Sequence, residues 1–210
     1  MKKILFIIVY TFIFAIISSM VYKEFKIPDS ENKGGFDMAI LNYNQTIDSL
    51  AGIFKLSPNY LMALIMLESS GKKKVSVRFE KRIYDQLLLT KKGKISDFEQ
   101  INAKTLESYS KKGLKKLACS YGPFQIMGYK SLELKIPLKA LVGKDHLYWT
   151  IKWINSDYGN YIKNGDYKNA FHIHNTGKKY PDDGIPTTFD PKYVENGLNY
   201  MMYFKNISKE

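Results

Sequence analysis

The segment from Ser57 to Gly71, SPNYLMALIMLESSG, decides the fold of this chain of 210 residues. Ser57 is a favourable N-cap residue, Pro58 suits the first position of a helix, and Gly71 can close the far end. The residues between these signals are mostly apolar. The segment therefore predicts a helix over about Pro58 to Ser69 that packs against the core of the protein.

Glu68 interrupts the apolar pattern of this helix. Leu61, Leu64, Ile65 and Glu68 stand at positions i, i+3, i+4 and i+7, so they share one face. Burial and the C-terminal end of the helix dipole both disfavour a carboxylate, and both raise its pKa. A carboxylic acid that keeps its proton near neutral pH can protonate a leaving glycosidic oxygen. The alternative is that the helix ends early and Glu68 is a solvated residue at its end.

Most of the remaining chain also has helical signals. Apolar residues recur at helical spacing in segments 37–54 and 147–158. Asp166 can cap a short helix through His174, and Asp190 followed by proline can begin a terminal helix. These patterns predict a fold that is mainly α.

Two segments carry weaker signals. Ser96 and Glu99 have the spacing of a capping box, which predicts a helix reaching towards Ala118 with an interruption at Gly113. The run Val75–Tyr84 is rich in β-branched and aromatic residues, so a small β-hairpin is expected there at most.

The N-terminal end has the features of an export signal. Lys2 and Lys3 precede the uncharged, apolar residues 4–22, a length that suits either a transmembrane anchor or a signal peptide. Residues 23–35 have the polar composition of a linker. We therefore expect residues 1–22 to form an apolar helix, residues 23–35 a linker, and residues 36–210 a domain outside the cytoplasm, anchored in the inner membrane or secreted to the periplasm.

The chain is strongly basic, with a net charge of +12. Such a charge favours an anionic environment, for example nucleic acid, anionic lipid or a cell-wall polymer. Only Arg78 and Arg82 are arginines, and arginine is the usual side chain for reading phosphates and guanines. No nucleic-acid partner is therefore expected. A single cysteine, Cys119, excludes an intrachain disulfide.

Four elements resemble the lysozyme-like lytic transglycosylases. They are ESSG at 68–71, SYGPFQIMG at 120–128, AFHIHNTG at 170–177 and the pair Tyr193-Val194. They match, in the same order, the family's E-S-x-G helix end, its G-x-x-Q-I motif, its A-x-Y-N-x-G motif and its later Y-V element. The resemblance covers about residues 50–202 and implies a lysozyme-like fold.

The resemblance also implies an activity and a site. Glu68 would be the catalytic acid and base that cleaves the bond between N-acetylmuramic acid and N-acetylglucosamine in peptidoglycan. The muramoyl 6-hydroxyl would then attack C1 and give a 1,6-anhydro end, with one carboxylate and no cofactor or metal. The residues expected to line or shape the glycan site are Ser70, Gln125, His174, Asn175, Gly177 and Tyr193.

Two departures from the family pattern leave the product open. His174 stands where the family has tyrosine. The interval between Glu68 and Gly122 is long, and its Val77–Glu80 stretch is similar to phage-type N-acetylmuramidases, which are hydrolases. Glu80 is then a candidate second carboxylate, although Arg78 and Lys81 beside it fit an exposed ion-paired residue.

The histidine pair His172 and His174 does not indicate a metal site. His172 and His174 lie two apart on the expected helix and point in different directions, which is poor for chelating a metal. The partners expected are peptidoglycan strands, the membrane through the N-terminal segment and, further, an envelope-spanning assembly. Two other function classes stay open: a non-catalytic wall-binding protein, and a basic membrane-active or nucleic-acid-binding protein that the shortage of arginine disfavours.

Overall fold

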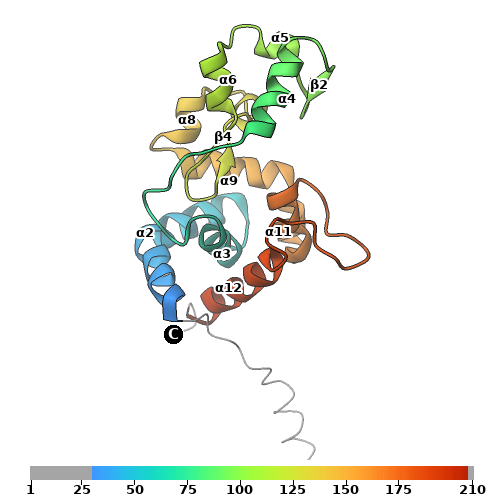
Figure 1. The fold of residues 1–210 in the computed structure, drawn as a ribbon. Coiled ribbons are helices and arrows are strands. Elements are labelled where there is room, and N and C mark those ends of the chain that lie inside the picture. The colour runs from blue at the N-terminus through green and yellow to red at the C-terminus, as the bar shows by residue number, and fades with distance from the viewer. Residues whose placement is uncertain (1–29, 208–210) are drawn as a thin grey trace, which may run out of the picture.

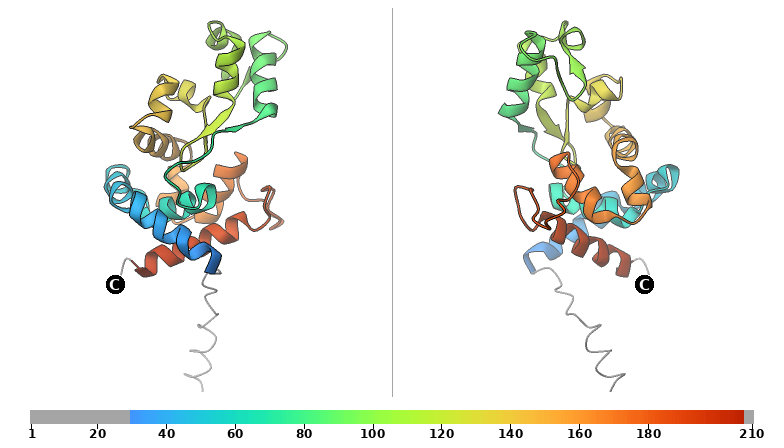
Figure 2. Two further views of the ribbon diagram at one scale, coloured as in Figure 1. Left: turned by 60° about the vertical axis from the view of Figure 1, so that its left-hand side comes forward. Right: turned by 90° about the vertical axis from the view of Figure 1, so that its right-hand side faces the viewer.

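The computed structural model describes residues 30–207, and their side chains from residue 34. This part of the chain is mainly helical, with eleven helices and two small antiparallel sheets. It forms a larger lobe and a smaller lobe, which Figures 1 and 2 show one above the other. The mainly α fold class is thus confirmed. The expected apolar segment 1–22 lies outside the described residues.

The larger lobe is built around the helix predicted from Ser57 to Gly71. That helix, α3, spans Pro58–Ser69 as expected, and the Ser57 hydroxyl accepts a hydrogen bond from the Tyr60 N–H. Its residues from Tyr60 to Met66 are all buried, so apolar contacts surround it on nearly every side. The other helices of this lobe are α2 (Ser30–Phe54), α9 (His146–Asp157), α10 (Gly159–Lys163), α11 (Tyr167–Thr176) and α12 (Tyr193–Ile207).

The smaller lobe has its own hydrophobic core. Leu87, Leu106, Leu114 and Leu117 are fully buried there and pack with Ile101 and Tyr129. This core is separate from the hydrophobic core around α3. The elements of the lobe are α4 (Lys81–Lys91), α5 (Ala103–Leu106), α6 (Lys111–Leu117), α7 (Lys130–Glu133), β2 (Asp97–Phe98) and β3 (Ile101–Asn102), and α8 (Leu138–Val142) leads back towards α9.

A three-stranded sheet lies between the two lobes. It has the order β1 (Arg78–Phe79), β4 (Cys119–Tyr121) and β5 (Ile126–Met127), with Arg78 opposite Ser120. The expectation of a local hairpin within Val75–Tyr84 is therefore wrong. That run lacks the Gly, Asn or Asp residues that a tight hairpin turn requires, and its strand pairs with a segment some forty residues later.

The helix expected from Ser96 towards Ala118 is also wrong. Asp97 pairs with Asn102, and the two-residue loop of Glu99 and Gln100 joins β2 to β3 as a hairpin. Both loop residues have positive φ, 51° and 61°, which a helix cannot contain. Helical structure resumes in two short pieces, α5 and α6, each with its own cap from Asn102 or Ser110.

The N-terminal boundary also differs from the expected linker. Helix α2 begins at Ser30, so the second half of the segment 23–35 is helical and continues into the domain. Within residues 30–207, no helix combines the length and the apolar character that a membrane span needs.

Candidate active site

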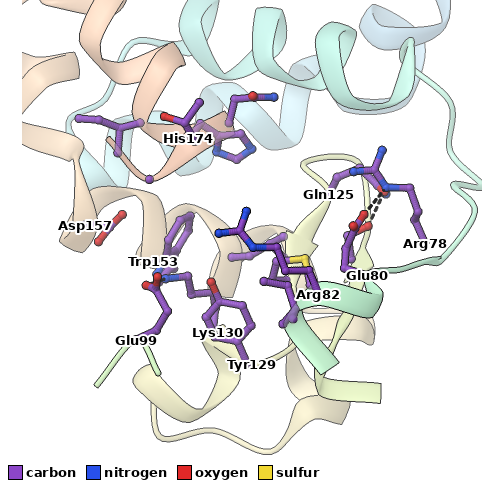
Figure 3. A pocket seen from close by; sticks show the side chains of 18 of the residues that line it. Arg78, Glu80, Arg82, Glu99, Gln125, Tyr129, Lys130, Trp153, Asp157 and His174 are labelled. Atoms are coloured by element: carbon purple, nitrogen blue, oxygen red, sulfur yellow. Dashed lines mark hydrogen bonds and ion pairs between the residues drawn. The ribbon is translucent and has the colours of Figure 1, made fainter. Parts of the chain in front are cut away.

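A groove of about 720 Å³ runs between the two lobes. The larger lobe contributes Glu68 at the end of α3 and the last turn of α11, the smaller lobe contributes the start of α4, and the sheet between the lobes contributes β1 and the β4–β5 hairpin. Figure 3 shows these walls facing each other, with His174 on one side and Arg78, Glu80 and Arg82 on the other. The groove is open to solvent, and its lining extends from Arg78 and Glu80 to Lys130 and Asp157.

The four residues 68–71 fix the position of Glu68 at the groove. The Ser69 hydroxyl donates back to the carbonyl of Ile65 at 2.8 Å, and Ser70 adopts the left-handed conformation that ends the helix. Gly71 then approaches α2 so closely that a Cβ there would lie 2.4 Å from the carbonyl oxygen of Gly35. Only glycine fits this position, which also has a positive φ of 71°.

Helix α2 holds the turn after Glu68 from outside. The Asn42 side-chain amide donates to the carbonyl of Gly71 at 3.0 Å, and the Tyr43 hydroxyl donates to the carbonyl of Lys72 at 2.7 Å. These bonds hold the two residues that follow the C-cap of α3 against α2. The acid is therefore carried on a rigid helix terminus.

The Glu68 side chain is only 17% exposed, although it faces the groove. Burial raises its pKa from 4.5 to about 7, while a hydrogen bond from Tyr193 and the positive charge of Arg78 act in the opposite direction. The Tyr193 hydroxyl, at the start of α12, donates to Oε1 of Glu68. The raised pKa expected from the sequence is thus found, with burial as its main cause. The alternative of a solvated Glu68 is wrong.

His174 lies beside Glu68 as a neutral side chain. Burial lowers the pKa of His174 to about 4, and its ring is only 5% exposed. Its Nε2 donates to the carbonyl of Phe124 at 3.1 Å, and its Nδ1 accepts from the Tyr158 hydroxyl at 2.6 Å. Because the ring is neutral at pH 7, the 3.9 Å approach of Nε2 to Glu68 is not an ion pair. His174 instead ties α11 to the β4–β5 turn.

Gln125 lines the groove, but its side-chain amide forms hydrogen bonds within the β4–β5 hairpin to which it belongs. Its Oε1 accepts from the Ser120 hydroxyl at 2.7 Å, and its Nε2 donates to the carbonyl of Gly122 at 3.0 Å. Its φ of 46° is positive, a conformation that non-glycine residues adopt at a cost. Gln125 therefore shapes the turn that faces Glu68. A contact with a glycan stays a prediction.

The other expected site residues divide into two groups. Asn175 and Gly177 line the groove. Gly177 has a φ of 73° and ends α11. Tyr193 and Ser70 are not among the lining residues: Tyr193 reaches the site through Glu68, and Ser70 is an exposed helix cap.

Glu80 is an ion-paired residue, as one of the two expectations had it. Its Oε1 lies 2.6 Å from Nε of Arg78, and its side chain is 33% exposed. Lys81 pairs instead with Asp85 at 2.5 Å. Glu80 nevertheless belongs to the wall of the same groove as Glu68.

The far end of the groove was missed by sequence reasoning. Lys130 is 12% exposed there, pairs with Glu133 at 2.8 Å and Glu99 at 3.4 Å, and lies 5.0 Å from the Trp153 ring centre. Asp157 lines the same end, and burial raises its pKa. The sequence offered one signal for this end of the groove: Trp153 is one of only two tryptophans in the chain.

The histidines do not form a metal site. His172 is fully buried, with Nδ1 2.7 Å from the carbonyl of Lys178 and Nε2 accepting from the Thr187 N–H at 3.1 Å. In the part of the chain that the structure describes, no group of three or more His, Cys, Asp or Glu side chains is placed to hold a metal ion.

Comparison with known proteins gives no relative for this chain. No family model matches it, and no match is found among curated proteins or among solved structures. The chemistry must therefore be argued from the groove itself.

Proposed function

We propose that this protein cleaves the glycan strands of peptidoglycan between N-acetylmuramic acid and N-acetylglucosamine, with Glu68 as acid and base. The observation that carries the proposal is a carboxyl group, Glu68, with a pKa raised to about 7, which faces an open groove of about 720 Å³. Near neutral pH such a group is present in both protonation states, so it can give a proton in one step and accept one in the next.

The proposed reaction has two steps. The protonated Glu68 gives its proton to the glycosidic oxygen as the bond from that oxygen to the muramoyl C1 breaks. The resulting carboxylate accepts the proton of the muramoyl 6-hydroxyl, whose oxygen bonds to C1 and forms the 1,6-anhydro ring. Tyr193 supports the ionised stage, because its hydrogen bond favours the carboxylate.

The ion pair of Glu80 favours this route over hydrolysis. A hydrolase normally needs a second carboxylate as a nucleophile or to activate water. Glu80 is held by Arg78 at 2.6 Å, which occupies one of its two oxygens. A muramidase is the second candidate, because Glu80 lines the same groove as Glu68.

The digestion of purified peptidoglycan tests the proposal. Wild type is expected to release muropeptides whose ends are lighter by one water than reducing ends, while Glu68→Gln releases about 10²–10⁴-fold less. Glu80→Gln should retain activity if the product is anhydro, whereas reducing ends that disappear in Glu80→Gln identify a muramidase. Equal release by wild type and Glu68→Gln contradicts both and leaves a non-catalytic wall-binding protein.

A location in the cell envelope belongs to the same proposal. It rests on the apolar segment 1–22 and on the polymer that the groove would cleave, and it includes a membrane anchor or export to the periplasm and an envelope-spanning assembly as a partner. Fractionation of cells that express the full chain tests it, with recovery in the cytosol as the contrary result.

A further inference from the structure

Both arginines of the sequence line the groove. Arg78 comes from β1 and Arg82 from the first turn of α4, whereas the other 30 basic residues of the chain are all lysines. Arginine differs from lysine in its planar fork of donors, which binds a carboxylate through two parallel hydrogen bonds. The two side chains best suited to this geometry are therefore on the same groove wall.

Arg82 is the cation of this groove that has no partner within the described residues. Three cations line the groove: Arg78 pairs with Glu80, and Lys130 pairs with Glu99 and Glu133. Among residues 34–207, the Arg82 side chain makes neither a hydrogen bond nor an ion pair. In Figure 3 its guanidinium points into the middle of the groove.

Helix stability does not explain the position of Arg82. It lies in the first turn of α4, where the helix dipole disfavours a positive charge. Lys81, its neighbour, is paired along the helix with Asp85 and does not line the groove. Neither the dipole of α4 nor an ion pair along that helix therefore stabilises the charge of Arg82. Its side chain faces the space that a ligand would fill.

We propose that Arg82 binds a carboxylate on the side chain of the muramoyl sugar, and so selects peptidoglycan over neutral glycans such as chitin. This inference rests on the proposed function. Both polymers contain N-acetylglucosamine, but only the muramoyl sugar carries an acidic substituent. The carboxylate belongs either to the stem peptide or, where the peptide has been removed, to the lactyl group itself.

Binding measurements in the Glu68→Gln background test the inference without turnover. The ligands are a peptide-bearing GlcNAc–MurNAc tetrasaccharide, the peptide-free form with its lactyl carboxylate, the same form with that carboxylate converted to a neutral methylamide, and chitotetraose. Adding Arg82→Gln should weaken binding of at least one carboxylate-bearing ligand about tenfold and leave the two neutral ligands unchanged. The ligand that weakens identifies the peptide or the lactyl group as the source.

Two matched variants distinguish the hydrogen-bonding geometry of the Arg82 guanidinium from the effect of a positive charge alone. Lys81→Gln removes one positive charge from the same turn of α4 and should change none of the four affinities. Arg82→Lys keeps the charge but loses the fork, so it should restore only part of the loss. Three results would overturn the inference. In Arg82→Gln, the affinity for the neutral ligands could fall as far as that for the carboxylate-bearing ones, or no affinity could fall at all. The third is that Lys81→Gln weakens binding as much as Arg82→Gln does.

The inference and the proposed function can fail separately. A wild type that cleaves peptidoglycan, together with an Arg82→Gln variant that binds all four ligands as well as its parent, removes only the role of Arg82. If the wild type cleaves nothing but binding follows the expected pattern, the proposed reaction is contradicted. Arg82 then remains a residue that binds the carboxylate of an acidic glycan.

Discussion

The Tyr193 hydroxyl donates a hydrogen bond to Oε1 of Glu68 and joins two residues that are 125 positions apart in the sequence. It brings the start of α12 against the end of α3, on the larger-lobe side of the groove. A hydrogen bond to the ionised carboxylate opposes the effect of burial on the pKa of Glu68. Burial and Tyr193 together set the pH range in which Glu68 can act as an acid.

Removal of this hydrogen bond should shift the pH dependence of activity. A general acid must be protonated in the free enzyme, so kcat/KM is expected to fall as the pH rises above about 7. Tyr193→Phe raises the pKa of Glu68, because the bond that favours the carboxylate is lost. The alkaline limb should therefore move up by about one pH unit. Tyr200→Phe, on the same helix but against Phe36, should not move it; an unmoved limb in Tyr193→Phe contradicts the assignment.

Burial of Glu68 should make the protein less stable as the pH rises. Between pH 4.5 and about 7 the folded carboxyl keeps its proton, while the unfolded chain has lost it, so the free energy of unfolding falls with pH. The loss amounts to about 3 kcal/mol. Glu68→Gln is neutral at every pH and should gain this amount relative to wild type by pH 8, as urea unfolding would measure.

His174 contributes a pH dependence of the opposite sign. Its pKa is lowered from 6.5 to about 4, so the folded ring stays neutral where the unfolded one is protonated, and stability rises over this range. The effect is common to wild type and Glu68→Gln, so their difference isolates Glu68. A wild type to Glu68→Gln difference that is constant with pH would disprove the burial effect.

His174 should also contribute to stability through its two hydrogen bonds. In His174→Phe, the Tyr158 hydroxyl and the Phe124 carbonyl both lose their hydrogen bond to the His174 ring. Leaving two such groups unsatisfied should cost about 2–4 kcal/mol in urea unfolding at pH 7. Tyr158→Phe breaks only the first bond and should cost less. Equal stability of His174→Phe and wild type would show that the bridge between α11 and the β4–β5 turn is not formed.

Gln100 should be a position at which glycine stabilises the protein. Its φ of 61° is in the left-handed region, which costs a non-glycine residue about 1 kcal/mol. Gln100→Gly should raise the free energy of unfolding by up to about this amount. Lys115→Gly, inside α6, should lower it by a similar amount. A loss of stability in Gln100→Gly would mean that the hairpin turn is different.

The same turn explains one failure of sequence reasoning. Ser96 and Glu99 satisfy the local spacing of a capping box, and no glycine or asparagine marks the hairpin between Phe98 and Ile101. The hairpin forms because Ile101 is buried in the small core and Phe98 packs against Tyr129. These contacts connect distant parts of the chain, so local propensity could not reveal them.

Sequence reasoning succeeded where the signals are local. The bounds of α3 follow from the Ser57 cap, Pro58 and Gly71, and helical spacing offered a buried Glu68 as one of two alternatives, the one that the structure supports. The opposite wall depends on the pairing of Arg78 with Ser120, which no local pattern announces. Arg82 and Trp153 therefore became visible only with the assembled groove.

Direct titration of the Glu68 carboxyl group tests the central claim most directly. In the full chain with ¹³C-labelled glutamate, Glu68 can be assigned by the signal that disappears in Glu68→Gln. We expect that signal to titrate at about pH 7. A midpoint at the ordinary glutamate value of 4.5 would show that the group is ionised and solvated at neutral pH, and the proposed acid of the groove would then be lost.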